Sequence, residues 1–248
     1  MLHLFNHMAE SLEETEKRRQ EFIANISHDL RSPLTSIQGF IEAISDGTIP
    51  PEKHQYYLKI VLEETGRLSK LANDLVDLSR VQSGKIVLER CDFDINELMR
   101  ETVNAMEPRF KKKNLRFSAI FDDEVTMVNA DPNMIKRVIQ NLVDNAIKFS
   151  YDNGNIYGEV REIGKKVYVY IRDCGKGISE EEMKHVFDRF FKADASRGVD
   201  KTGVGLGLSI VKEFVNAHGE KINISSKENV GTEFVFSLEA AKEEKNKA

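Results

Sequence analysis

Two long stretches near the start of the sequence repeat apolar side chains at every third or fourth residue. This spacing places the side chains on one side of an α-helix, which turns once in about 3.6 residues. Between the two stretches the chain carries Asp46-Gly47 and Pro50-Pro51, which are typical of turns and helix ends. The pattern therefore predicts a helix over residues 2–46 and another over residues 52–83, joined as an antiparallel hairpin.

Each predicted helix carries one apolar stripe, and a lone hairpin cannot shield both stripes from water. The stripe of the first helix contains Phe5, Met8, Leu12, Phe22, Ile26, Leu30, Pro33, Leu34, Ile37, Ile41 and Ile44. The stripe of the second contains Tyr57, Ile60, Val61, Leu68, Leu71, Leu75, Leu78 and Val81. We therefore predict that two copies of the chain pair their hairpins into a dimeric four-helix bundle.

The pattern changes after residue 85, where short segments typical of strands are mixed with helical ones. The predicted strands are 85–89, 115–121, 125–129, 155–162, 167–172, 221–226 and 232–238. The predicted helices are 95–112, 131–148, 179–188 and 205–217, with Asp131 and Ser179 as N-caps. Because strands and helices do not alternate strictly, an α+β fold of the α/β sandwich type is favoured. The chain is thus predicted to be multidomain, with an all-α helical hairpin before this domain.

Lysine and arginine number 36 and aspartate and glutamate 41, which gives a formal net charge of −5. Because contacts to phosphate backbones need a basic surface, we expect no nucleic-acid partner. The two cysteines, Cys91 and Cys174, cannot form a disulfide framework, and a reducing compartment is expected. No apolar run approaches the roughly 18 residues of a membrane span, so we expect a soluble intracellular piece.

His28 lies in the first predicted helix, about 200° around the helical wheel from Ile26 and so opposite the apolar stripe. Asp29 lies beside it, and Pro33 occupies a helix interior, where proline costs about 3 kcal/mol and bends the helix. The pattern indicates an exposed histidine–aspartate pair on a helix that flexes nearby. An ordinary solvated surface histidine fits the same pattern.

Asn141, Asn145 and Lys148 are spaced to share one face of the predicted helix over residues 131–148. Asparagine has a low helix propensity, so two asparagines at this spacing indicate a role other than helix formation. Their amide oxygens suit a hard cation, and the lysine suits phosphate groups. An ordinary exposed polar face remains the alternative.

Two glycine-rich segments complete the candidate chemistry. Asp173-Cys174-Gly175-Lys176-Gly177 follows a predicted strand, where a carboxylate can accept a hydrogen bond and glycines allow close approach of a ligand. Gly203-Val204-Gly205-Leu206-Gly207-Leu208 opens a predicted helix, whose first amides can bind phosphate. The second segment is neither a Walker A loop nor a good Rossmann fingerprint. Plain glycine turns would explain each segment taken alone.

Taken together, these segments resemble the sequence boxes of bacterial sensor histidine kinases of two-component systems. Residues 22–34, FIANISHDLRSPL, resemble the phospho-acceptor box of the HisKA dimerisation domain. Residues 141–149 resemble the asparagine box, 173–177 and 203–208 the two glycine boxes, and 187–191 the phenylalanine box. All five occur in the family's order and with similar spacing, and the resemblance covers about residues 15–240.

The resemblance implies a division of the chain. Residues 15–84 would form the dimerisation and histidine phosphotransfer domain, residues 85–91 a linker and first strand, and residues 92–240 a GHKL-type catalytic ATP-binding domain, before a charged tail at 241–248. Residues 1–14 resemble the end of a HAMP signalling helix. That match implies that this chain is the cytoplasmic portion of a sensor anchored in the cell membrane.

The resemblance also implies an activity, that of an ATP-dependent protein-histidine kinase. His28 would attack the γ-phosphorus of ATP, and Asp29 would hold the proton of the other ring nitrogen. The phosphoryl group would pass to an aspartate of a response regulator. Ser32 stands where the family usually has threonine or asparagine, a position associated with dephosphorylating the regulator, so phosphatase activity stays open.

ATP and Mg²⁺ are the implied cofactors, with Asn145 as the protein ligand of the metal and Asp173 as acceptor for the adenine amino group. The implied nucleotide-binding residues are Asn141, Asn145, Lys148, Phe149, Asp173, Gly175, Gly177, Ile178, Phe190, Lys192, Gly203, Gly205, Leu206, Gly207, Leu208 and Thr232. Gly175 and Gly177 would admit the base. Lys192 stands where the family commonly has arginine. Lysine keeps the positive charge but lacks the planar guanidinium that can form two parallel hydrogen bonds to a phosphate.

Two other functions fit parts of the same sequence. A clamp ATPase of the same superfamily would use the nucleotide site but has no histidine-bearing hairpin. A signalling scaffold would bind ATP without phosphorylating itself, and the intact His28, Asn145 and Asp173 argue against it.

Overall fold

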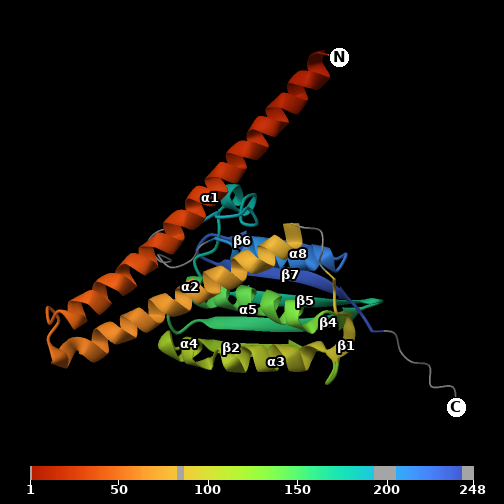
Figure 1. Cartoon of the computed structure of the whole chain (residues 1–248). Helices are drawn as coiled ribbons and strands as arrows, with labels where there is room; N and C mark the ends of the chain where they lie inside the picture. Colours follow the sequence, from red (N-terminus) through yellow and green to blue (C-terminus); the bar gives the residue numbers. More distant parts are fainter. Residues whose placement is uncertain (1, 83–86, 193–204, 242–248) are drawn as a thin grey trace. The chain divides into compact units, whose positions relative to one another are not determined.

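The structure, a computed structural model, describes residues 2–82, 87–192 and 205–241 (Figure 1). The side chains of residues 2–19, 21 and 81–82 are also outside the description. Several predicted features therefore lie outside the described residues. They are Gly203, most of the loop before it, the first two residues of the strand predicted at 85–89, and the tail from residue 242. The chain divides into two compact units, residues 1–76 and 77–248.

The first unit contains the predicted helical hairpin. Helix α1 spans Leu2–Ser45, the short 3-10 helix η1 spans Pro51–Lys53, and α2 spans His54–Gln82, beyond the boundary of the unit. Gly47 ends α1 with φ +80°, a conformation that glycine adopts without strain. The Ile49 amide then donates to the Ala43 carbonyl at 2.8 Å, and Thr48 N donates to the Asp46 carboxylate at 2.9 Å. The local hydrogen bonds thus fix the turn that the glycine and prolines predicted.

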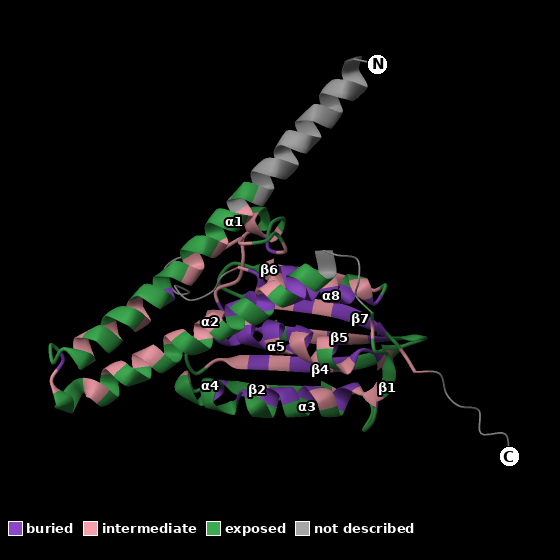
Figure 2. Ribbon diagram, viewed as in Figure 1, coloured by how far each residue is buried: buried purple, intermediate pink, exposed green. Residues whose placement is uncertain are grey.

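The two helices of the hairpin contact each other through Tyr57 of the second predicted stripe and through Phe40, which was not assigned to the first stripe. Phe40 and Tyr57 pack with ring centroids 5.1 Å apart, and Pro33 is buried. Much of the described part of α1 and α2 is exposed (Figure 2). Leu34 and Ile41 of the first stripe are 53% and 49% exposed, in line with the prediction that a lone hairpin cannot cover both stripes. Both lie at the edge of the stripe, where a single partner helix does not reach.

The second unit is built on a five-stranded sheet in the order β2-β4-β5-β7-β6. Strand β2 pairs with β4 in parallel, and the other neighbours are antiparallel. The strands are β2 (Arg116–Phe121), β4 (Asn155–Ile163), β5 (Lys166–Asp173), β6 (Ile222–Lys227) and β7 (Gly231–Glu239). Strands β1 (Cys91–Asp94) and β3 (Met127–Ala130) pair in a separate two-stranded sheet.

Helices cover one face of the five-stranded sheet (Figure 1). The helices of this unit are α3 (Ile95–Ala105), α4 (Glu107–Lys112), α5 (Pro132–Phe149), the short α6 (Glu180–Met183) and α8 (Gly207–Ala217). The core lies between helices and sheet, where Ile139, Leu142, Ile210 and Phe236 have no exposed surface. The α/β sandwich is therefore confirmed.

Three predicted elements differ from the structure. Residues 87–90 are not in a strand, because pairing with β3 begins only at Cys91. The helix predicted over residues 95–112 is interrupted at Met106, which has φ −96° and ψ 3°, and α4 restarts there with a proline in its first turn. The helix predicted to reach Asp188 ends at Met183 and continues as turns.

Candidate functional site

The histidine in the first unit lies on α1 with its side chain 83% exposed, as its place on the helical wheel predicted. Its Nδ1 lies 3.2 Å from Oδ1 of Asp29, whose own side chain is only 17% exposed. With the proton on Nδ1 and held by this carboxylate, Nε2 keeps its lone pair. Ser32, one turn further along α1, is exposed as well. The geometry therefore offers an accessible ring nitrogen, beside a carboxylate that can hold the proton of the other ring nitrogen.

The asparagines of the second unit lie on α5, which begins as predicted. The Asp131 carboxylate accepts hydrogen bonds from the backbone amides of Asn133 and Met134, and Pro132 occupies the first turn. Asn141 is buried, whereas Asn145 and Lys148 are half-buried. Both asparagines and the lysine thus share a helix face that is partly open.

The second glycine segment lies against this face of α5. A Cβ at Gly207 would meet Oδ1 of Asn141 at 3.2 Å, so the start of α8 touches the Asn141 amide. Gly205 has φ +78°, and a Cβ there would lie 2.7 Å from the backbone of Phe190. The Phe190 amide donates to the Gly205 carbonyl at 2.9 Å. The phenylalanine segment, the glycine segment and α5 are therefore brought together.

The other residues predicted around the start of α8 are also described, except Gly203. Leu206 is buried with 1% exposure, and Leu208 and Lys192 are half-buried. Gly203 lies outside the described residues, so its role stays a prediction.

Asp173 ends β5 in a buried position, with 7% of its surface exposed. Burial raises the pKa of Asp173 to about 6, although hydrogen bonds from the backbone of Gly175 and Thr232 act to lower it. Such a raised pKa in a buried carboxyl is typical of a functional site. A buried acceptor at a strand end suits a ligand that donates a hydrogen bond.

The glycines after Asp173 have a structural role that the sequence did not reveal. A Cβ at Gly175 would lie 2.2 Å from the Phe149 carbonyl oxygen, and one at Gly177 would lie 2.0 Å from the Lys227 carbonyl oxygen. Gly177 also has φ +68°. Both positions therefore require glycine to let neighbouring backbone pass. That these glycines also make room for the adenine base of a nucleotide stays a prediction.

Two further residues support this loop and were missed by the sequence analysis. Ser226 Oγ accepts a hydrogen bond from the Ile178 amide at 2.9 Å and lies 2.9 Å from the Thr232 hydroxyl. Gly231 has φ +138°, and a Cβ there would lie 2.0 Å from the Asp173 carbonyl oxygen. The glycine in the turn before the last predicted strand was the only available signal for this contact.

Among the described residues, no cluster of three or more histidine, cysteine, aspartate or glutamate side chains is placed to hold a metal. Asn145 is half-buried and has one amide oxygen, which suits a cation that takes most ligands from phosphate and water. The donor set therefore fits Mg²⁺ that arrives with a nucleotide.

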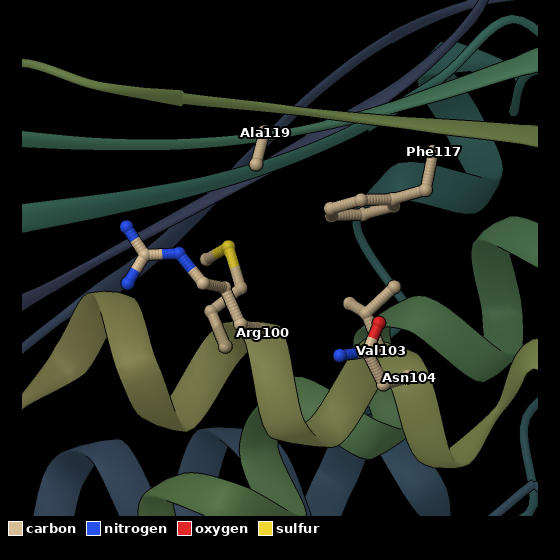
Figure 3. Close-up of a pocket in the computed structure, with 6 residues that line it drawn as sticks. Arg100, Val103, Asn104, Phe117 and Ala119 are labelled. Atoms are coloured by element: carbon tan, nitrogen blue, oxygen red, sulfur yellow. The ribbon is translucent and has the colours of Figure 1, made fainter.

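A cavity of about 260 Å³ lies elsewhere in this unit, between α3 and β2. Figure 3 shows Phe117 and Ala119 of the strand facing Arg100, Val103 and Asn104 of the helix. None of the predicted nucleotide-binding residues lines this cavity.

Two family models match the chain, one for each unit. Residues 18–84 match the His Kinase A (phospho-acceptor) domain, and residues 130–242 match the histidine kinase-, DNA gyrase B-, and HSP90-like ATPase. Sensor histidine kinase YclK of Bacillus subtilis (strain 168) is 34% identical over 242 residues, which cover 94% of this chain and 51% of YclK. The chain thus spans about half the length of this relative.

Solved structures agree with the family models. Histidine kinase ThkA, in its complex with response regulator protein TrrA, is 31% identical with a TM-score of 0.69, over 95% of this chain and 67% of ThkA. Full-length ShkA in complex with AMPPNP is 25% identical with a TM-score of 0.66, over 89% of this chain and 46% of ShkA. The chain belongs to the sensor histidine kinases of two-component systems. Within the described residues, the structure contains no helix with the length and apolar character needed to cross a membrane.

Proposed function

We propose that this chain is the ATP-dependent autophosphorylating part of a sensor kinase, with His28 as the phosphorylated residue. The observation that carries the proposal is the exposed His28 ring, paired with Asp29, in a chain that also brings Asn141, Asp173 and the glycine segments into one unit. A clamp ATPase would have no use for the histidine-bearing hairpin. A scaffold would have no use for a carboxylate of Asp29 placed to hold the Nδ1 proton of His28.

In the proposed reaction, Nε2 of His28 attacks the γ-phosphorus of ATP. A P–N bond forms, the bond from the γ-phosphorus to the β–γ bridging oxygen breaks, and ADP leaves with that electron pair. Asp29 holds the Nδ1 proton and stabilises the positive charge that develops on the ring. Catalysis of phosphoryl transfer rests mainly on positioning and charge neutralisation, which the second unit would provide.

The nucleotide would be held by the residues assembled around α5 and Asp173. The Asp173 carboxylate would accept a hydrogen bond from the adenine amino group, while Asn141 and Lys148 would position the phosphates. Asn145 would give Mg²⁺ its protein ligand, and the metal would supply charge neutralisation at the phosphates. Support comes from the adjacency of Asn141 to Gly207 and from the similarity to ShkA, whose structure contains AMPPNP.

Dimerisation is proposed for the hairpin because apolar side chains remain on its surface. Ile23, Leu34 and Ile41 are each about half exposed and fall within about 20° of one another on the wheel of α1. Leu58, Leu62 and Val76 form a similar exposed stripe on α2. A second hairpin would cover both stripes and complete a four-helix bundle.

The phosphoryl group would then pass to an aspartate of a response regulator, as the ThkA complex with TrrA suggests by similarity. Ser32 retains a hydroxyl that could serve dephosphorylation of that regulator. We further propose that residues 1–14 continue a signalling helix of a HAMP-like segment and that the parent protein is anchored in a membrane, with this portion in the cytoplasm.

The direct test is incubation of the chain with γ-labelled ATP and Mg²⁺. A phosphoramidate is labile in acid and stable in base, so we expect the protein-bound label to show that behaviour. His28→Ala should remove the label while ATP binding is kept. A label that survives acid, or that persists in His28→Ala, would contradict the proposed acceptor.

A further inference from the structure

The amine of Lys113 lies at the C-terminal end of α5, the helix that carries Asn145 and Lys148. Its Nζ donates hydrogen bonds to the carbonyl oxygens of Ile147, Lys148 and Ser150 at 2.9, 2.7 and 3.0 Å. An ammonium group has three donors, and all three are used here.

These bonds complete the end of a helix that has no glycine cap. Ser150, which follows α5, is extended with φ −63° and ψ 146°, so the left-handed capping motif is absent at this end. Each of the last four carbonyl oxygens of α5 accepts a hydrogen bond. Ser150 N donates to Ala146 and Lys176 N donates to Phe149. Lys113 Nζ donates to the two carbonyls between them, those of Ile147 and Lys148. A cation is also favourable at this end of the helix dipole. Lys113 therefore replaces a backbone cap.

Lys113 is itself held in place by a second set of bonds. Its carbonyl oxygen accepts from the Asn153 amide at 3.0 Å, and the Asn114 side-chain amide donates to the Asn153 side chain at 2.7 Å. The turn between α4 and β2 is thus tied to the loop between α5 and β4. Burial lowers the pKa of Lys113, while nearby Asp152 acts to raise it.

The carbonyls that Lys113 binds lie between the two halves of the proposed nucleotide site. On one side is the α5 face with Asn145 and Lys148. On the other side is the loop after Asp173, because Ser150 pairs with Gly175 in an isolated β-bridge and Lys176 N binds the Phe149 carbonyl at 3.1 Å. A shift of this short backbone segment would change the distance between the two halves.

We propose that Lys113 is a positioning residue, which sets the placement of the phosphate-binding face of α5 relative to the loop that binds the base. The inference rests on the proposed function, since it assumes that ATP occupies both halves. A ligand that contacts both halves then depends on Lys113, whereas a ligand that contacts only the base-binding half does not.

The test compares the binding of Mg-ATP and of adenosine to the full-length chain by calorimetry. In Lys113→Met we expect the Kd for Mg-ATP to rise about tenfold or more, because two helix carbonyls lose their donor. The Kd for adenosine should change less than about threefold. Lys111→Met is the matched control, since Lys111 lies in α4 two residues before Lys113, is 72% exposed and pairs with Glu107 across one turn. We expect it to match the wild type for both ligands.

The outcomes separate this inference from the proposed function. If the wild-type chain does not bind Mg-ATP, the proposed function fails and the inference fails with it. If the wild type binds Mg-ATP and Lys113→Met binds it equally well, the inference alone is overturned. Equal loss of ATP and adenosine binding would also overturn it, since general loss of structure affects both ligands. Should Lys113→Met not fold, Lys113→Gln is measured instead, whose amide has two donors where the ammonium has three. We then expect a smaller rise in the Kd for Mg-ATP with the Kd for adenosine unchanged, and unchanged Mg-ATP binding overturns the inference.

Discussion

The hairpin and the α/β unit bury their apolar side chains to very different degrees. In the hairpin, the residues with described side chains include several large apolar ones that are half exposed or more, such as Leu34, Leu58 and Leu62. In the second unit Ile139, Val169 and Phe236 have no exposed surface at all. One chain therefore completes the α/β core by itself, whereas the hairpin is left with surface that a second copy would cover.

The candidate sites of the two units differ in the same way. The site in the hairpin consists of His28 and its neighbour Asp29 on one helix. The site in the second unit joins segments that are far apart in sequence, through contacts such as Gly207 with Asn141 and Gly231 with Asp173. The first site depends on exposure, and the second depends on close packing.

The largest expected contrast comes from adding one methyl group to a glycine in each unit. A Cβ at Gly231 would lie 2.0 Å from the Asp173 carbonyl oxygen, so Gly231→Ala should lower the free energy of unfolding by about 3 kcal/mol. Gly39 in α1 has no atom within 4 Å of such a Cβ, so Gly39→Ala should raise it by about 0.5–1 kcal/mol. Urea unfolding followed by circular dichroism measures both. Similar effects at the two positions would remove the contrast in packing.

The next contrast concerns the need for a second copy. Leu62 is 73% exposed in the single chain, and Leu62→Glu would place a charge in the proposed interface. We expect the dimer dissociation constant to rise about a hundredfold, which corresponds to about 2.7 kcal/mol.

The matched control for Leu62→Glu is Glu63→Lys, about 100° away on the same helix. It should leave the dimer intact. Sedimentation across micromolar dilution measures the dissociation constants. A wild-type chain that is monomeric throughout, or a dimer unaffected by Leu62→Glu, would contradict the bundle.

The smallest expected effect is a pH dependence confined to the second unit. Burial raises the pKa of Asp173 from 3.8 to about 6, so its contribution to stability is fully present below pH 3.8, is lost as the pH rises to 6 and stays absent above that pH. Adenosine should need the ionised form as acceptor. Its Kd should therefore rise about tenfold as the pH falls one unit below 6 and stay constant well above 6.

Calorimetry with adenosine measures this dependence, since adenosine has no phosphate that titrates in the same range. Asp173→Asn is the control, because it lacks the titrating group and should bind with little pH dependence. A wild-type Kd that does not change between pH 5 and pH 8 would show that adenosine binding does not depend on the ionised Asp173 carboxylate.

The sequence predicted those features that depend on local periodicity and on single residues. The hairpin, the exposure of His28 and the Asp131 cap of α5 all follow from patterns within a few turns of helix. The interruption at Met106 was missed because it depends on where α4 packs as well as on Pro108. The exposure of Leu34 and Ile41 agrees with the prediction that a lone hairpin cannot cover both stripes, although the sequence did not show which stripe residues would stay exposed.

Contacts between distant segments had no such local signal. The roles of Gly231, Ser226 and Lys113 depend on which backbone atoms the fold places beside them. For the glycine segments, the sequence pattern predicted a close approach of a ligand, and the family resemblance assigned them to a nucleotide site. The reason for glycine, a carbonyl oxygen about 2 Å from where a Cβ would be, is visible only in three dimensions.

The central claim is that the two units divide the reaction, one providing the phosphoryl acceptor and the other the nucleotide site. The most direct measurement records Mg-ATP affinity and acid-labile label together in the wild type, His28→Ala and Asn145→Ala. The account predicts that His28→Ala keeps the wild-type affinity and carries no label, whereas Asn145→Ala loses both Mg²⁺-dependent affinity and label. Label that persists in Asn145→Ala at the wild-type level, or ATP affinity that disappears in His28→Ala, would contradict this division.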